Sequence, residues 1–253
     1  KTLYFAKGFV DDKGNIENSW DTSISPTHGL YRVGVIQPNE QLTFPKPINT
    51  NFGPTGNPNI DVVLDGSKWE FSNEKVLDWA IVDGTAKWSD RNIAQQETSF
   101  IFDGISQFID IEFNFIGFYD SPQEATAAGS EISIISDDLE GGLYGRAHFP
   151  TQESWWDDFY SGDYGDVHLN KNIFPNLGEI VANDPDLRAG FQFVTLHEIG
   201  HALGLKHPFH PGGGGQGTAK NLNITPLVGS SNMGEILYSV MSYQNAGEFA
   251  GSG

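Results

Sequence analysis

The chain has 253 residues, with 33 acidic and 14 basic side chains and a formal net charge of −19. This acidity argues against nucleic acid or an anionic membrane as partner, because both require a basic footprint. Cysteine is absent, which excludes disulfides and thiolate zinc ligands, and no stretch approaches the roughly 18 uninterrupted apolar residues of a membrane span.

The first 74 residues are rich in glycine, proline and asparagine, and they predict an irregular, β-leaning N-terminal extension. Turn signals occur at 11–15, 51–59 and 64–68, and the alternating segment 29–37 predicts a strand. Since the opening segment lacks an initiator Met and a signal-peptide layout, we expect a processed chain. The extension is either a pro-region or a structural part of the mature protein, and no chemistry is assigned to it.

Residues 75–253 predict a second domain of the α+β class, with a twisted mixed β-sheet and two main helices. Strands are expected at 76–82, 112–119, 131–136, 142–149 and 165–170, the last of these being a strand or a turn. Two glycines in 142–149 favour an edge position. We therefore expect this strand to hold an extended peptide by main-chain pairing.

The first predicted helix lies within 89–111 and begins at an Asp90 cap. Its apolar residues at helical spacing are Ile93, Phe100, Ile101, Ile105 and Phe108. The second predicted helix, within 183–205, is the strongest in the chain, with Asn183 or Asp184 as its cap and Pro185 in its first turn.

The second helix carries the run HEIGHALGLKH at 197–207, which predicts a zinc site. His197 and His201 are one turn apart on the same helix face, so both can reach one metal ion at about 2.0–2.1 Å. Gly204 can adopt the positive φ that ends a helix and returns the chain, which makes His207 a third ligand. Glu198 follows the first ligand and can take a proton from a water at the open metal position.

The run HEIGHALGLKHP and the later segment SVMSY at 239–243 resemble the metzincin clan of zinc endopeptidases, and within it the serralysin family. The resemblance implies that Met241 lies in a turn beneath the metal and sets the packing there. It also implies that Tyr243 is an additional, movable zinc ligand that can hydrogen-bond the oxyanion. Weaker similarity extends over residues 64–253.

Two histidines depart from the serralysin pattern. His148 and His168 lie in segments that resemble those supplying a second, structural zinc in matrix metalloproteinases. Asp137 and Asp138 are candidate oxygen ligands for such a site, although two histidines twenty residues apart are more often ordinary core or surface residues. His210 is expected to be a loop residue.

Calcium is the second departure. Serralysins are usually followed by a roll of glycine-rich repeats that bind calcium, and no such repeat occurs here. The run of glycines at 212–215 has no aspartate in register and predicts a flexible loop. The acidic clusters at 11–12, 137–138 and 155–166 predict solvated loops. Ca²⁺ is therefore compatible with the family but unsupported by this chain.

The resemblance implies a secreted, extracellular bacterial enzyme, a monomer, that hydrolyses internal peptide bonds of protein or peptide substrates with one catalytic Zn²⁺ and Glu198 as general base. One alternative is a metzincin closer to the matrix metalloproteinases, with a second structural metal. The other is a non-catalytic surface- or matrix-binding module on the same fold. Cleavage specificity depends on the loops at 208–238, whose shape the sequence does not predict.

Overall fold

The computed structural model describes residue 60 and residues 63–71, 74–150, 164–207 and 240–241, together with the backbone of five short strands before residue 50. The chain divides into two compact units, Lys1–Phe44 and Pro45–Gly253. Among the described residues, no helix is both long and apolar enough to cross a lipid bilayer.

The first unit contains two small antiparallel pairs, β1 (Leu3–Phe5) with β4 (Tyr31–Val33) and β2 (Phe9–Val10) with β3 (Ile16–Glu17). The second unit begins with another antiparallel pair, β5 (Lys46–Asn49) with β6 (Ser67–Glu70). Residues 45–74 thus lie in the same unit as the predicted metal-binding helix. Whether the N-terminal part is a pro-region or a structural element stays a prediction.

A five-stranded mixed sheet forms the centre of the second unit, with the strand order β10-β11-β9-β7-β8. Its strands are β7 (Val76–Asp83), β8 (Glu112–Tyr119), β9 (Ile132–Asp137), β10 (Gly145–Ala147) and β11 (Val167–Asn170). Four strands run parallel, and β10 pairs antiparallel with β11 at the edge. The predicted mixed sheet and the edge position of residues 142–149 are confirmed, and residues 167–170 form an interior strand.

Both predicted main helices are present, α2 (Arg91–Ser106) and α5 (Pro185–Ala202). Asp90 caps α2 by accepting hydrogen bonds from the backbone N–H groups of Asn92 and Ile93, and Asp184 caps α5, as the cap signals predict. Two short helices, α3 (Pro122–Ala127) and α4 (Leu177–Asn183), were not predicted. They have six and seven residues, too few for an apolar period to stand out.

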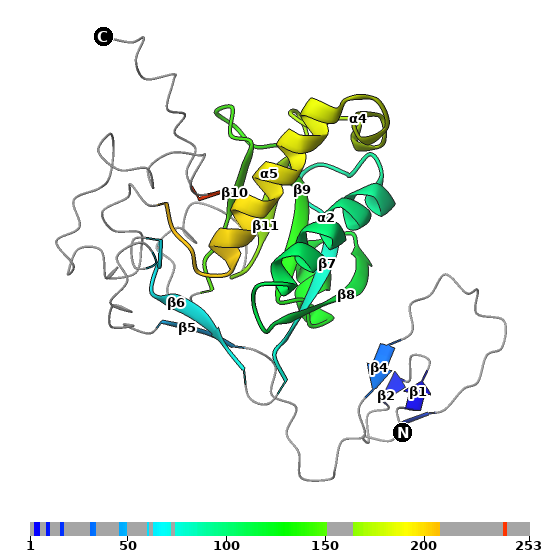
Figure 1. The fold of residues 1–253 in the computed structure, drawn as a ribbon. Coiled ribbons are helices and arrows are strands. Elements are labelled where there is room, and N and C mark those ends of the chain that lie inside the picture. Colours follow the sequence, from blue (N-terminus) through cyan, green and yellow to red (C-terminus); the bar gives the residue numbers. More distant parts are fainter. Residues whose placement is uncertain are drawn as a thin grey trace. The chain divides into compact units, whose positions relative to one another are not determined.

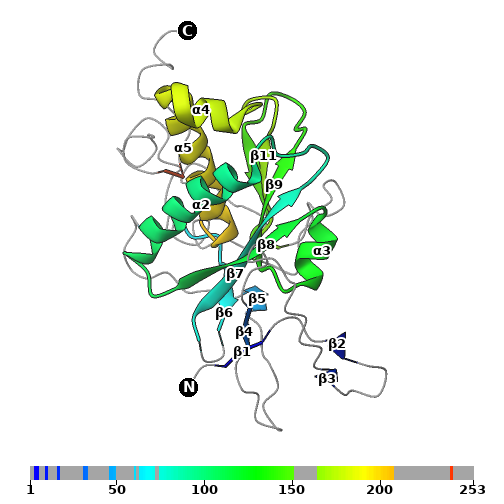
Figure 2. The ribbon, with the colours of Figure 1, turned by 90° about the vertical axis from the view of Figure 1, so that its right-hand side faces the viewer.

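The helices cover the sheet in two layers. Helices α2, α4 and α5 lie on one face of the sheet and α3 on the other (Figures 1 and 2). Because side chains alternate along a strand, Trp79 and Ile81 of β7 join the main core with α2 and α5. Ala80 and Val82 face the other way and pack in a smaller cluster with Ala125 of α3. Burial on both faces explains why β7 is apolar nearly throughout.

Two apolar residues predicted for the buried face of the first helix are exposed. Phe100 is 67% exposed and Phe108 is 89% exposed, whereas Ile101 is buried. Phe100 is turned about 100° away from Ile101 on the helix surface, and Phe108 follows the end of α2 at Ser106. The predicted apolar face was therefore wider than the real one.

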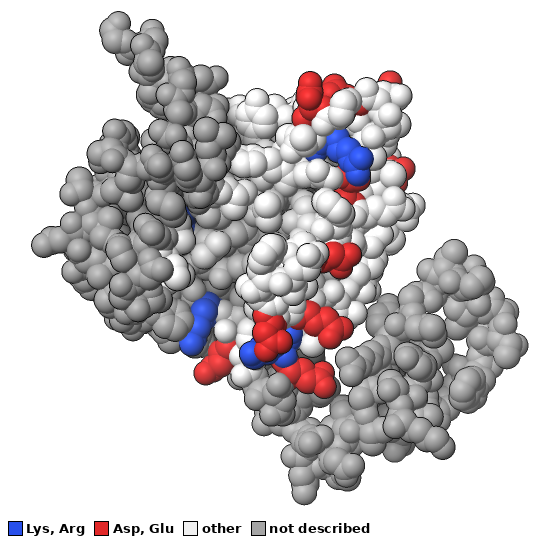
Figure 3. Space-filling model, in the orientation of Figure 1, with Lys and Arg blue, Asp and Glu red and all other residues white. Residues whose placement is uncertain are grey.

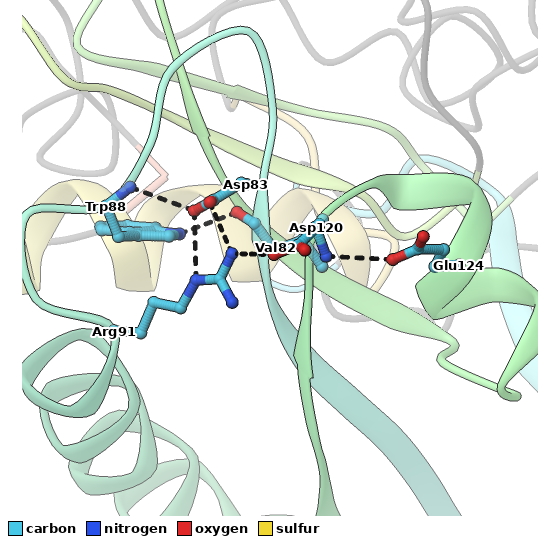
Figure 4. A network of polar contacts seen from close by, with 6 residues as sticks. All are labelled: Val82, Asp83, Trp88, Arg91, Asp120 and Glu124. Atoms are coloured by element: carbon cyan, nitrogen blue, oxygen red, sulfur yellow. Dashed lines mark hydrogen bonds and ion pairs between the residues drawn. The ribbon is translucent and has the colours of Figure 1, made fainter.

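A network of polar contacts ties the start of α2 to the ends of two strands (Figure 4). The Arg91 guanidinium binds Asp83 at the end of β7 and Asp120 just after β8. Asp83 also accepts a hydrogen bond from the Trp88 backbone N–H.

Oppositely charged side chains also lie next to each other on the surface of the protein. On the face seen in Figure 3, the described Lys and Arg side chains lie beside Asp and Glu rather than gathering into a basic patch.

A buried carboxyl group makes the stability of the fold depend on pH. Glu131 lies before β9, and its Oε2 accepts a hydrogen bond from the Asp78 backbone N–H at 2.6 Å. Burial raises the pKa of Glu131 to about 8 from its ordinary value of 4.5. Since the folded state binds this proton more tightly than the unfolded chain, the stabilisation is complete below pH 4.5 and is lost as the pH rises through about 8.

The substitution Glu131→Gln is expected to stabilise the fold by roughly 1–3 kcal/mol at about pH 8, and by much less near pH 5. Glutamine keeps an oxygen that can accept the hydrogen bond but cannot ionise. Urea unfolding of wild type and variant across this range measures the difference. Equal stability differences at both ends of the range would contradict the prediction.

Candidate metal centre

The three histidines of the run at 197–207 converge at the C-terminal end of α5. The Nε2 atom of His207 lies 3.0 Å from that of His197 and 3.1 Å from that of His201. All three side chains offer ligand atoms within 4.8 Å of one another. Within the described ranges, no other set of three or more His, Cys, Asp or Glu side chains comes close enough to hold a metal ion.

Two of these histidines have a fixed tautomer. His197 Nδ1 donates to the Val240 carbonyl at 2.6 Å, and His201 Nδ1 donates to the Leu205 carbonyl at 2.6 Å. A carbonyl oxygen can only accept, so each ring carries its proton on Nδ1 and presents the Nε2 lone pair. Backbone carbonyls that orient the rings in this way are typical outer-shell partners of metal-binding histidines.

The donor set fits zinc. Three imidazole nitrogens with one open position is the arrangement of catalytic zinc sites. Tetrahedral ligands about 2.05 Å from a zinc ion lie roughly 3.3 Å apart, close to the spacing of the Nε2 atoms. Burial lowers the pKa of His197, which favours the neutral ring that a metal ligand requires.

Local structure explains how His207 reaches the other two rings. Helix α5 ends at Ala202, and Gly204 has φ 95°, a left-handed conformation that reverses the chain. The backbone N–H of Leu205 donates to the Gly200 carbonyl at 2.8 Å and closes the turn. The predicted positive φ of Gly204 is confirmed.

Glu198 lies on the buried side of α5, one residue after the first predicted ligand. Burial raises the pKa of this carboxyl group to about 8, and a cation bound by the neighbouring histidines would lower it again. The Glu198 side chain lies directly against Gly145 of the edge strand β10. A methyl group at Gly145 would lie 2.9 Å from Glu198 Cγ and 3.0 Å from Glu198 Oε1.

Met241 packs against α5 at Gly200, and its role beneath a bound metal stays a prediction. It is 1% exposed, and its sulfur lies where a methyl group on Gly200 would be, at 2.4 Å. The preceding residue, Val240, is the one whose carbonyl binds His197. Met241 thus contacts the helix between the two helical histidines. Tyr243 and His210, like the glycines at 212–215 and most of the cluster at 155–166, lie outside the described residues.

His148 and His168 are brought together beside the sheet edge. Both are buried, and their ring centroids are 5.7 Å apart. Asp137 Oδ2 accepts a hydrogen bond from His168 Nδ1 at 2.7 Å, so it orients that ring instead of offering a free oxygen. His168 Nε2 is buried and has no hydrogen-bond partner among the described residues. Asp138 accepts from Asn172. Burial lowers the pKa of His148 to about 4.

Sequence reasoning missed several parts of this centre. The Val240 and Leu205 carbonyls act through the backbone, which carries no sequence signal. Gly200 and Gly145 are glycines in the sequence, but only the fold shows which side chains a methyl group at each position would contact. The segment 63–69 includes the predicted turn at 64–68, to which no chemistry was assigned, and it contacts the turn that carries His207.

Three imidazole ligands that can hold one metal ion, two of them from a single helix, are typical of zinc hydrolases. The family model for matrixin, of peptidase family M10, matches residues 68–213, and the chain therefore belongs to the matrixin family. Members of this family are zinc metalloendopeptidases that act on peptide substrates. A search of curated proteins found no significant match.

Proposed function

We propose that this zinc metalloendopeptidase is a secreted, serralysin-like enzyme that cleaves internal peptide bonds of extracellular proteins with Glu198 as general base. The observation that carries the mechanism is the convergence of three Nε2 atoms, with the buried Glu198 directly after the first of these histidines on α5. The serralysin-like subtype is supported by HEIGHALGLKHP together with SVMSY. The acidic composition suits a protein that must stay soluble outside the cell.

In this proposal His197, His201 and His207 would hold one zinc ion. Bound there, it would supply Lewis-acid chemistry for polarising a scissile carbonyl and for making a water molecule more acidic. Glu198 accepts the proton of the attacking water and passes it to the leaving amine. Tyr243 hydrogen-bonds the oxyanion, and the edge strand β10 pairs with the substrate main chain.

The proposal is tested by cleavage of casein and of a peptide library, with mass spectrometry of the products. We expect fragments cut at internal bonds, loss of cleavage with a chelator and recovery on addition of zinc. Cleavage that survives complete removal of metal would contradict the proposal. Zinc-loaded protein that cleaves nothing would favour the alternative of a binding module on this fold.

The alternative closer to matrix metalloproteinases is favoured by one observation, the pair of buried imidazoles of His148 and His168 with Asp137 behind His168. It requires a second metal ion held by these two histidines and by further ligands. Metal analysis distinguishes the two proposals. Two zinc ions per chain, with one lost in His168→Ala, would favour this alternative, and one zinc ion in both proteins would exclude it.

The proposed role of Glu198 predicts a strong effect at Gly145. The substitution Gly145→Ala is expected to displace the Glu198 carboxyl group and to lower kcat by about 10–100-fold, because small misplacements of reacting groups are costly. Zinc affinity should change little, since the three atoms nearest to the new methyl group belong to Glu198 and Val194 and none to a histidine ligand. A control is Gly104→Ala, where a methyl group meets nothing within 4 Å. An unchanged kcat in Gly145→Ala would contradict the prediction.

A further inference from the structure

The turn that carries His207 is held by residues 63–69, here named the anchor segment. The backbone contacts are Asp65 N–H donating to the Gly204 carbonyl at 2.9 Å, Lys206 N–H donating to the Val63 carbonyl at 2.7 Å, and an antiparallel bridge between Leu64 and Leu205. The turn therefore does not stand alone. Its backbone groups are satisfied by a segment far away in sequence.

The anchor segment also closes the end of α5. Trp69 Nε1 donates to the Ala202 carbonyl at 2.9 Å, one of the carbonyl groups that a helix end leaves without an intrahelical partner. Trp69 is itself buried as part of the main hydrophobic core. At Gly204 a methyl group would lie 2.4 Å from the Ser67 carbonyl oxygen. The segment and the turn thus approach as closely as glycine allows.

Two charged side chains are buried at this contact. Asp65 is 2% exposed and Lys206 is 1% exposed. The negative charge of Asp65 is close enough to favour the charged form of Lys206. Asp65 Oδ2 also accepts a hydrogen bond from Ser67 Oγ at 2.7 Å. A buried charge that loses its partner is strongly destabilising, so each charge constrains where the other can lie.

We propose that Asp65 and Trp69 are positioning residues for the third metal ligand: they hold the turn at 204–206 and thereby fix His207 against His197 and His201. The inference rests on the proposed zinc chemistry of these histidines. Two ligands on a helix are placed by the helix itself. The third lies beyond it, so its position depends on whatever holds the turn.

The test measures zinc affinity in the full chain by competition with a chromogenic chelator. Asp65→Asn removes one charge and keeps the shape, and Trp69→Phe removes the donor to the Ala202 carbonyl and keeps an aromatic ring. Each variant is expected to bind zinc about tenfold or more weakly, the loss typical of outer-shell substitutions. Replacement of zinc by Co²⁺ should give a visible spectrum that differs from wild type, because the ligand geometry changes.

A matched control separates positioning from general stability. Asp83 is also buried, at 4% exposed, but binds Trp88 and Arg91. Asp83→Asn should lower the unfolding midpoint and keep zinc affinity within about twofold, as for a distant site. Zinc affinities of Asp65→Asn and Trp69→Phe within the same limit, with unchanged Co²⁺ spectra, would overturn the inference. Wild type that binds no zinc would instead overturn the proposed function.

Discussion

Replacement of Glu198 by alanine is expected to lower the rate of peptide cleavage by about 10²–10⁴-fold, the usual contribution of a general base. The zinc content should not change, because the three imidazoles and the carbonyl groups that orient two of them remain. The rate should fall because alanine lacks the carboxyl group that burial on α5 and close contact with Gly145 hold in one position. Cleavage rates and metal analysis of the same preparation measure both effects.

Glu97 provides a matched control for this substitution. It is another buried glutamate, and it anchors α5 through hydrogen bonds from Arg188 and Gln192. Glu97→Gln should weaken the packing of α2 against α5 and leave kcat close to wild type. A Glu198→Ala protein that keeps its zinc and still cleaves at a wild-type rate would eliminate Glu198 as the base.

The second large effect is expected at Gly200, between the two helical histidines. In Gly200→Ala the new methyl group would lie 2.4 Å from the Met241 sulfur, so the Met241 side chain must shift, and because it is buried we expect the turn at 240–241 to move with it. The Val240 carbonyl would then lose its hydrogen bond with His197. We expect zinc affinity to fall about 10–100-fold and stability to fall by about 1–3 kcal/mol.

Replacement of Gly190, on the same helix, by alanine should raise the stability of the fold instead of lowering it. A methyl group there meets nothing within 4 Å, so Gly190→Ala should stabilise by about 0.5–1 kcal/mol through helix propensity alone. The double variant Gly200→Ala/Met241→Ala is expected to recover part of the lost zinc affinity, because the smaller side chain makes room. Wild-type zinc affinity in Gly200→Ala would contradict the proposed packing.

The metal centre could be predicted largely from sequence because its parts are local. Helix geometry fixes the spacing of His197 and His201, and only glycine readily takes the conformation of Gly204. The main strands and both long helices followed from their periods and caps. The sheet order did not follow, because parallel strands pair through crossovers that leave no mark in the sequence.

The remaining parts of the centre depend on contacts between distant segments. Nothing in residues 63–69 points to His207, and Gly145 carries no sign of Glu198, because each contact exists only once the sheet and α5 have packed. The exposure of Phe100 could not be predicted from the sequence either. Its type predicts burial, but its position beside Ile101 turns it outward.

The anchor segment has a consequence for the order of events during folding. The centre joins residues 63–69, 197–207 and 240–241, so it requires the closure of long loops, which is slow compared with helix formation. An isolated α5 would present His197 and His201 with no fixed place for His207. We therefore expect metal capture, and with it the power to digest other proteins, to arise only when folding is nearly complete. A chain that is still folding would then not cleave the proteins around it.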